Sequence, residues 1–168
     1  MLEDNLVTIY SDGSVRPRNP GVGGWAAVML YKDRRKELSG GFRLTTNNRM
    51  EMYGAVAALE ALNRPCRVEL FSDSQYLINA FLKRWVFNWE RRGWRKASNF
   101  GEGEPVLNTD LWLRLLEQHR THEITFNWVR GHFGVTENER CDHLAGIQSA
   151  LPAVSHPIDE IYQALRKA

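Results

Sequence analysis

Four acidic residues far apart in the chain stand where a fold can bring their side chains together. They occur in the segments YSDGS, TTNNRMEM, LFSDSQY and ENERCDHLA, as Asp12, Glu51, Asp73 and Asp142. Carboxylates at close range repel one another by several kcal/mol unless protons or hard cations neutralise them. Carboxylate oxygens are also the ligands that Mg²⁺ and other hard divalent ions prefer. If the four side chains meet in the fold, they form a divalent-metal site.

Each carboxylate also has a purely structural interpretation. Asp12 lies in a DGS sequence typical of a turn, and Glu51 can close a capping box with Asn48. Asp73 can stabilise a helix N-terminus, and Asp142 can be an exposed helix residue. Taken together, however, their positions at strand ends and helix starts favour the metal site, because open α/β sheets place ligands there.

Strand and helix patterns predict the elements that position these residues. Apolar, β-branched runs predict strands over 6–12, 25–32, 36–44, 66–72 and 123–129. Helical spacing and capping signals predict helices from Asn48 to before Pro65, from a Ser72–Gln75 capping box to Leu82, and over 109–119 and 137–150. Three consecutive strands followed by alternating helices and strands predict an α/β fold with a mixed five-stranded sheet.

These elements place three carboxylates at predicted boundaries. Asp12 falls at the end of the first strand, Glu51 in the first turn of the first helix, and Asp73 at a strand-to-helix junction. Asp142 falls on a helix beside a GHFGV loop that contains His132. A loop histidine is usually only solvated, but an imidazole with a pKa of about 6.5 can also exchange protons near neutral pH.

The composition is that of one compact domain. The chain has 168 residues, of which 43% are hydrophobic and 25% charged, and its formal net charge is +2. Local groups of Lys and Arg must therefore bind any polyanion. Cys66 and Cys141 have no metal-binding or disulfide spacing, and we find no charged leader and no apolar run of about 18 residues. We expect a cytoplasmic monomer with no membrane partner.

Aromatic and basic residues alternate over 83–96, in the segment KRWVFNWERRGWRK. Trp85 and Trp89 are four residues apart on a predicted helix, a spacing typical of core packing. The neighbouring Lys and Arg residues favour a nucleic-acid surface instead, with aromatic faces against sugars and cations against phosphates. The tryptophans that we assign to the core or its margin are Trp25, Trp112 and Trp128.

The motifs, taken in order, resemble those of type I ribonuclease H. The matching segments are YSDGS, NPGVGGWA, TTNNRMEM, ALEAL, SDSQY, the aromatic-basic segment, LNTDLW, WVRGHFG and ENERCDHLA, over about residues 5–150. The resemblance implies a ribonuclease H-like five-stranded mixed sheet with helices on both faces. We therefore predict a catalytic domain over 1–150. The tail over 151–168 contains an apolar stripe that predicts a short amphipathic helix, at Ile158, Ile161, Tyr162 and Leu165.

The resemblance also implies a chemistry. In that family the carboxylates that match Asp12, Glu51, Asp73 and Asp142 hold two Mg²⁺ ions. Two such ions about 3.5–4 Å apart orient and deprotonate a water and stabilise the leaving 3′-oxygen. The implied activity is hydrolysis of the RNA strand of RNA–DNA hybrids, giving 5′-phosphate and 3′-hydroxyl ends, with Mn²⁺ as a substitute for Mg²⁺. By the same resemblance, His132 is a catalytic proton shuttle or product-release residue.

Distinguishing RNA from DNA requires contacts to 2′-hydroxyl groups. The amide side chains suited to this are those of Asn19, Asn47, Asn48 and Gln75. The alternative for Asn47 and Asn48 is that they only cap a helix. By resemblance, Thr46 and Asn108 bind a phosphate of the DNA strand, a contact that positions the duplex without reading its sequence.

Three features depart from the family pattern: an extended VRPR segment before Asn19, an acidic GEGEP segment, and Glu90 within the aromatic-basic segment. They predict weaker and more salt-sensitive hybrid binding without loss of activity. The alternatives are another nuclease, integrase or transposase of the same fold, a non-catalytic hybrid-binding module, and a structural α/β domain. A non-catalytic module would lack one of the carboxylates, and all four are present.

Overall fold

The computed structural model describes residues 5–167 and has a five-stranded sheet at its centre. The strands are β1 (Leu6–Arg16), β2 (Gly21–Tyr31), β3 (Arg34–Thr45), β4 (Arg67–Ser72) and β5 (Glu123–Trp128), in the spatial order β3-β2-β1-β4-β5. β1, β2 and β3 pair antiparallel, whereas β4 runs parallel to β1 and β5 parallel to β4. The predicted five-stranded mixed sheet is confirmed. Residues 1–4 of the predicted catalytic domain and residue 168 of the predicted tail lie outside the described residues.

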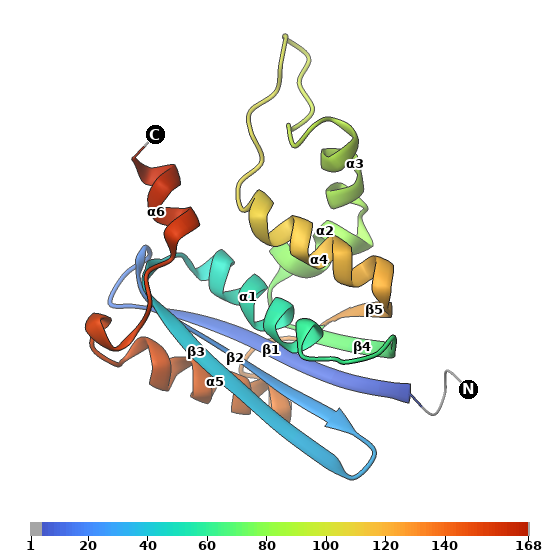
Figure 1. Cartoon of the computed structure of the whole chain (residues 1–168), viewed down its shortest axis with the longest axis vertical. Helices are drawn as coiled ribbons and strands as arrows, with labels where there is room; N and C mark the ends of the chain where they lie inside the picture. The colour runs from blue at the N-terminus through green and yellow to red at the C-terminus, as the bar shows by residue number, and fades with distance from the viewer. Residues whose placement is uncertain (1–4, 168) are drawn as a thin grey trace.

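Helices cover both faces of the sheet, as predicted. They are α1 (Asn47–Glu60), α2 (Gln75–Leu82), α3 (Trp85–Arg91), α4 (Thr109–Thr121), α5 (Thr136–Ser149) and α6 (Glu160–Arg166), with a short 3₁₀ helix η2 (Ala153–Ser155). Figure 1 shows α1, α2 and α4 on one face and α5 on the other, with α3 leading into a protruding loop. The protrusion therefore stands away from the sheet that carries the carboxylates.

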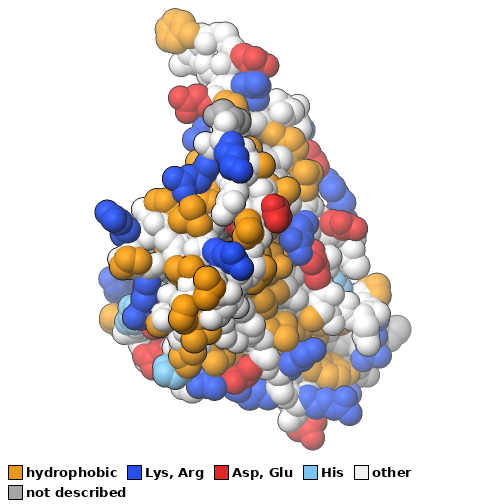
Figure 2. Space-filling view, turned by 60° about the vertical axis from the view of Figure 1, so that its left-hand side comes forward, with side chains coloured by type: hydrophobic (Ala, Val, Ile, Leu, Met, Phe, Trp, Pro, Cys, Tyr) orange, Lys and Arg blue, Asp and Glu red, His pale blue; other side chains and the backbone are white. Residues whose placement is uncertain are grey.

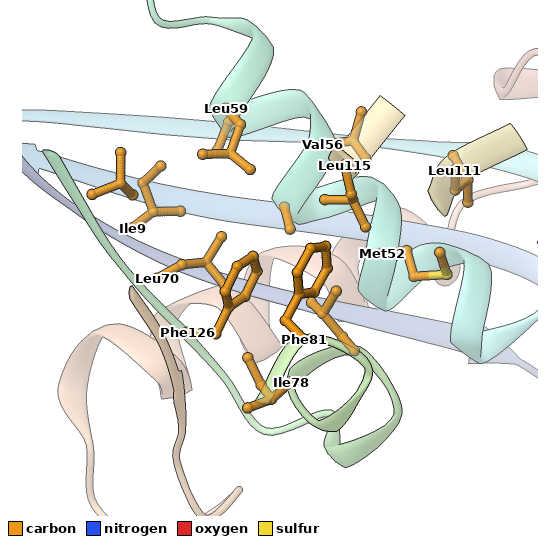
Figure 3. Packing of buried hydrophobic residues seen from close by; sticks show 14 of the residues in the cluster. Ile9, Met52, Val56, Leu59, Leu70, Ile78, Phe81, Leu111, Leu115 and Phe126 are labelled. Atoms are coloured by element: carbon orange, nitrogen blue, oxygen red, sulfur yellow. The ribbon is translucent and has the colours of Figure 1, made fainter. Parts of the chain in front are cut away.

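The main hydrophobic core lies between the sheet and the layer of α1, α2 and α4. Figure 3 shows Ile9 and Leu70 of the sheet facing Val56 of α1 and Leu115 of α4. Trp112 of α4 is fully buried, which confirms its predicted place in the core. Burying each large apolar side chain contributes about 1.5–3 kcal/mol, so this core fixes α1 firmly over β1.

Small residues bring α5 close to the opposite face. Ala26 and Val28 of β2 form a second buried cluster with Cys141 and Ala145 of α5. A Cβ at Gly24 would lie 2.2 Å from the carbonyl oxygen of Ala145, so only glycine allows this approach. Cys141 is a buried free thiol, in agreement with the lack of a disulfide spacing in the sequence.

The first strand is longer than predicted. β1 continues to Arg16, so Asp12 lies inside the strand and not at its end. The DGS sequence is therefore not a turn, and Gly13 pairs with Trp25 of β2. A Cβ at Gly13 would lie 2.5 Å from the backbone nitrogen of Glu51, so this glycine is needed for the close packing of α1 on β1.

Two predicted helix starts are also wrong. α2 is capped by Ser74, whose hydroxyl accepts a hydrogen bond from the Leu77 N–H, whereas Ser72 accepts from the Ser74 N–H and forms no box with Gln75. The hydroxyl nearer to the free N–H groups of the first turn makes the cap.

In α1 the cap is Thr46, so the helix begins at Asn47. Glu51 therefore lies in the second turn and not in the first, and it closes no capping box with Asn48. One turn into the helix, Glu51 can face β1.

The segment after residue 150 docks along the edge strand β3. The Arg43 N–H donates to the carbonyl oxygen of Pro157 at 2.9 Å, and Arg43 Nε donates to that of His156 at 2.7 Å. Asp159 is buried and caps α6. The predicted short helix is present, but its apolar stripe remains largely exposed. Hydrogen bonds and ionic contacts, more than the stripe, hold the tail in place.

The length and hydropathy of the helices bear on membrane insertion. Within residues 5–167, none of the helices is both long and apolar enough to span a bilayer.

Candidate active site

The register of β1 and β4 brings Asp12 and Asp73 together. The two parallel strands pair as far as Ser11 and Ser72, where β4 ends. Asp12 and Asp73 are the next residue of each segment, so they lie side by side where the parallel pairing stops. Open α/β sheets place ligands beside the carboxyl ends of their strands, and Asp73 directly follows the end of β4.

Trp128, the last residue of β5, and Gly131, in the loop that follows, fix the position of Asp73. The indole N–H of Trp128 donates to the carbonyl oxygen of Asp73 at 3.0 Å. A Cβ at Gly131 would lie 2.7 Å from Asp73 Oδ2, so glycine lets the loop pass close to the carboxylate. Trp128 is 45% exposed, and its predicted assignment to the core or its margin is wrong, because its indole instead binds the backbone at Asp73, between β4 and α2.

Glu51 completes a cluster of three carboxylates. One carboxylate oxygen each from Asp12, Glu51 and Asp73 lies within 4.8 Å of the other two. Among the described residues, Oε2 of Glu51 is buried without a hydrogen-bond partner. A buried carboxylate oxygen that lacks a donor is costly, so the cluster is incomplete as a purely structural arrangement.

Burial raises the pKa of all three carboxyl groups, and repulsion within the cluster raises it further in Asp12 and Glu51. Burial, followed by the charge of Asp73, raises the pKa of Asp12 from 3.8 to about 7, although the Gly13 N–H donates to Asp12 Oδ1 at 2.8 Å. Burial and the charges of Asp12 and Asp73 raise the pKa of Glu51 well above its ordinary value. Burial also raises the pKa of Asp73. The cluster therefore favours bound protons or a bound cation over three bare charges.

Asp142 lies at the rim of this cluster. Its side chain is 45% exposed, and its charge raises the pKa of both Asp12 and Asp73. His132 is 80% exposed, and its Nδ1 lies 3.9 Å from Asp142 Oδ2. The structure thus brings three of the four predicted carboxylates within ligand distance of one another and leaves Asp142 beside His132.

Comparisons with known proteins identify the family. The family model described as RNase H matches residues 4–150. A ribonuclease H of Nitratidesulfovibrio vulgaris is 54% identical over 144 residues, which cover 86% of this chain and 89% of the relative. A ribonuclease H of Granulibacter bethesdensis is 55% identical over 143 residues, 85% of this chain and 91% of the relative. The chain belongs to the ribonuclease H family.

Solved ribonuclease H structures share the fold. LC9-RNase H1, a type 1 RNase H with the type 2 active-site motif, is 28% identical with a TM-score of 0.73, over 86% of this chain and 74% of that chain. LC11-RNase H1, solved in complex with an RNA/DNA hybrid, is 22% identical with a TM-score of 0.61, over 93% and 99% of the two chains. As a ribonuclease H, the chain is a metal-dependent endonuclease that hydrolyses the RNA strand of RNA–DNA hybrids.

One residue of the ribonuclease H site escaped the sequence analysis. Asn138 of α5 is buried, and its side-chain amide lowers the pKa of the Asp73 carboxyl group, against the larger effect of burial. Its Oδ1 has no hydrogen-bond partner among the described residues. The signal in the sequence was its spacing, because residues 138 and 142 are four apart and share one helix face.

The amide residues predicted to contact RNA lie at two helix starts. Asn47 and Asn48 are exposed at the beginning of α1, and Gln75 is exposed at the beginning of α2. Asn19 Oδ1 accepts a hydrogen bond from the Asn47 N–H at 3.1 Å, which joins the loop after β1 to α1. The capping alternative for Asn47 and Asn48 is wrong, because Thr46 makes the side-chain cap.

The two residues predicted to bind a DNA phosphate are both contacted by Arg49. Thr46 Oγ1 accepts a hydrogen bond from the Arg49 N–H at 3.3 Å. Asn108 Oδ1 accepts from Arg49 Nη1, also at 3.3 Å. Arg49 is almost fully buried and was not singled out by the sequence.

The aromatic-basic segment forms α3 and the loop beyond it. Trp85 is 37% exposed, and Lys83 Nζ lies 5.5 Å from the centre of its ring. Trp89 is half-buried and packs against Trp112, with ring centres 5.6 Å apart. Trp85 therefore lies where the predicted surface requires it, whereas Trp89 serves partly as core.

Two acidic residues of this region, Glu90 and Glu102, are paired with arginines. Glu90 forms an ion pair with Arg120 of α4 at 2.7 Å, and Glu102 forms one with Arg95 at 3.1 Å. Figure 2 shows Lys and Arg side chains in separate groups among hydrophobic and acidic ones, without one continuous basic field on that face. This arrangement agrees with the small net charge and leaves hybrid contacts to local groups.

Proposed function

We propose that Asp12, Glu51 and Asp73, with Asp142 at the rim, form the metal-binding catalytic centre at which this ribonuclease H cuts RNA. The observation that carries the proposal is the cluster itself, in which one buried and two partly buried carboxylates lie within 4.8 Å of one another and one buried oxygen has no donor among the described residues. Hard oxygen ligands with raised pKa values fit a divalent cation, because the cation replaces the protons that would otherwise hold the cluster together.

We assign Mg²⁺ as the ion, two per site with substrate, and Mn²⁺ as a substitute. When bound there, Mg²⁺ supplies an activated water and neutralises charge on the leaving oxygen. The residues of the chain hold the site in place. The pairing of β1 with β4 fixes Asp12 and Asp73, and the close packing of α1 on Gly13 of β1 places Glu51 beside them. The Asn138 amide favours the charged form of Asp73.

His132 is proposed as the proton-transfer or product-release residue. Its ring is exposed on the loop between Gly131 and Gly134 and lies beside Asp142. An exposed imidazole next to a carboxylate can accept a proton from the reacting group and release it to solvent. It assists the centre without being a ligand.

The RNA–DNA hybrid is proposed to lie across the starts of α1 and α2, with its DNA strand toward α3. Asn19, Asn47, Asn48 and Gln75 contact the RNA strand, Thr46 and Asn108 a DNA phosphate, and Trp85 and Trp89 the DNA backbone. The support is exposure at helix starts for the amides and an exposed, cation-flanked ring for Trp85.

We further propose a catalytic domain over 1–150, a C-terminal tail over 151–168, and a monomer that works in the cytoplasm. The match to the family model ends at residue 150. Two buried free thiols suit a reducing compartment.

The test is cleavage of a labelled RNA–DNA hybrid with Mg²⁺, beside single-stranded RNA, duplex RNA and duplex DNA. Wild type, Asp12→Asn and the control Asp33→Asn are compared, since Asp33 is an exposed acid on the turn between β2 and β3. We expect RNA-strand cuts only in the hybrid, lost in Asp12→Asn and retained in Asp33→Asn. Hybrid binding without cleavage by wild type would favour the non-catalytic module and contradict the proposal.

A further inference from the structure

A buried ionic cluster joins the C-terminal segment to the start of α1. Arg49 donates from Nε and Nη2 to both oxygens of Asp159, at 2.8 and 3.1 Å, and from Nη1 and Nη2 to both oxygens of Asp110, at 2.9 and 2.8 Å. The side chains of Arg49 and Asp159 are 3% and 7% exposed. Bidentate pairing of this kind fixes the plane of the guanidinium as well as its position.

Asp159 is itself held from several sides. Its Oδ2 also accepts a hydrogen bond from the Thr45 hydroxyl at 3.0 Å, and its Oδ1 accepts from the Tyr162 N–H at 3.1 Å. The preceding residues are anchored on β3, where the His156 ring lies so close to Gly41 that a Cβ there would be 2.7 Å from it. The docked tail therefore presents Asp159 to Arg49 in one defined place.

The fixed guanidinium sets the orientation of the Asn108 amide. Arginine offers only donors, so the group of Asn108 that faces Arg49 Nη1 must be its oxygen. The amide nitrogen then points the other way, and one of its N–H groups donates to the Tyr76 hydroxyl at 3.1 Å. The second N–H is a donor of the kind that a phosphate oxygen accepts.

We propose that Asp159, acting through Arg49, is a positioning residue for the DNA-phosphate contact of Thr46 and Asn108, so that the C-terminal segment belongs to the hybrid-binding apparatus. The inference rests on the proposed function of those two residues. It gives the tail a part in binding substrate in addition to its part in stability. Without Asp159 the guanidinium is held from one side only, and the Asn108 amide can turn away from the phosphate.

The experiment measures kcat and KM on hybrids whose DNA strand carries a single uncharged methylphosphonate linkage, moved one position at a time. The variants are Asp159→Asn and Arg49→Lys, which keeps the charge but loses the planar fork. The control is Glu60→Gln, which removes a carboxylate that pairs with Arg114 between α1 and α4 on the exposed side. Unfolding midpoints show whether each variant is folded at the assay temperature. If Asp159→Asn is unfolded there, the inference is tested with Arg49→Lys alone.

In wild type and Glu60→Gln we expect one linkage at which loss of charge raises KM about tenfold, the size of one charged hydrogen bond. In Asp159→Asn and Arg49→Lys the same modification should raise KM less than about twofold, with kcat unchanged, because the contact is already lost. Folded variants that keep the full KM effect would overturn the inference, as would a wild type that cuts hybrid but has no sensitive linkage. A wild type that cuts no unmodified hybrid would instead overturn the proposed function.

Discussion

Two carboxylates at the start of α1 lie in opposite environments. Asp159 pairs with Arg49 of this helix, and Glu51 follows Arg49 by two residues. Asp159 accepts hydrogen bonds from the Arg49 guanidinium, from the backbone N–H of Tyr162 and from the hydroxyl of Thr45. Glu51 meets Asp12 and Asp73, and one of its oxygens has no donor among the described residues. The first arrangement is complete without any ligand, whereas the second is not.

The difference shows how one helix start separates anchoring from catalysis. A carboxylate that is buried with a cation and hydrogen-bond donors stabilises the fold. Removing it leaves the charge of the cation buried without a full set of partners. A carboxylate buried among other carboxylates raises the pKa of the whole group and favours a bound cation. Substituting an amide for the carboxylate should therefore have opposite effects on stability in the two places.

The largest expected effect is on catalysis at Glu51. Glu51→Gln removes one ligand charge, so kcat on hybrid should fall about 1000-fold, since metal-borne stabilisation amounts to several kcal/mol. The unfolding midpoint of the metal-free protein should rise near neutral pH, because repulsion is relieved. Single-turnover cleavage and thermal unfolding measure the two effects. Glu117→Gln, a substitution of an exposed residue on α4, should alter neither kcat nor the unfolding midpoint. An equal loss of kcat in Glu51→Gln and Glu117→Gln would contradict a special role for the Glu51 carboxylate.

The next largest effect is on stability at Asp159. Asp159→Asn should lower the free energy of unfolding by about 2–3 kcal/mol, less than for a fully unpaired buried charge because Asp110 still pairs with Arg49. Urea unfolding measures it. Glu60→Gln, which breaks a pair more than a third exposed, should cost less than about 1 kcal/mol. An Asp159→Asn protein as stable as wild type would show that the two clusters do not differ as described.

A smaller effect is expected at His132, outside both clusters. His132→Ala should lower kcat about 100-fold, the low end of general acid–base effects, and should leave the stabilisation by Mg²⁺ intact. Hybrid cleavage and thermal unfolding measure these two properties. His143→Ala is the matched control, an exposed histidine on α5 one residue after Asp142. Loss of Mg²⁺ stabilisation in His132→Ala would mean that the imidazole is a ligand.

The sequence predicted what local patterns determine. Strand order, helix order and the four carboxylates follow from periodicity and from motifs of known spacing. Asp12 was misplaced at a strand end because DGS is a turn signal, and only the packing of α1 on Gly13 explains why the strand continues. Ser72 was taken as a cap because of spacing, whereas geometry favours Ser74.

Long-range partners could not be predicted in the same way. Arg49 and Asp159 are 110 residues apart, and nothing in either local segment indicates the other. Asn138 was overlooked because an asparagine on a polar helix is ordinary until the fold places Asp73 beside it. Charge and burial at these sites come from the tertiary fold, which local patterns do not encode.

We propose that the cluster of Asp12, Glu51 and Asp73 is destabilised by its own charge until a divalent cation binds. Because the folded pKa of Asp12 is raised from 3.8 to about 7, the folded state binds protons more tightly than the unfolded state. Stability of the metal-free protein is then lost as pH rises through that window, and Mg²⁺, which competes with protons, should restore more of it at high pH.

The most direct measurement is the unfolding midpoint of wild type and Asp12→Asn at about pH 5 and about pH 8, with and without Mg²⁺. Comparison with Asp12→Asn removes the contribution of other titrating groups, including the buried histidines. The account predicts that wild type loses more stability than the variant on going to high pH without metal, and gains several degrees with Mg²⁺ there while the variant gains little. Equal pH dependence of both proteins and no gain with Mg²⁺ would contradict it.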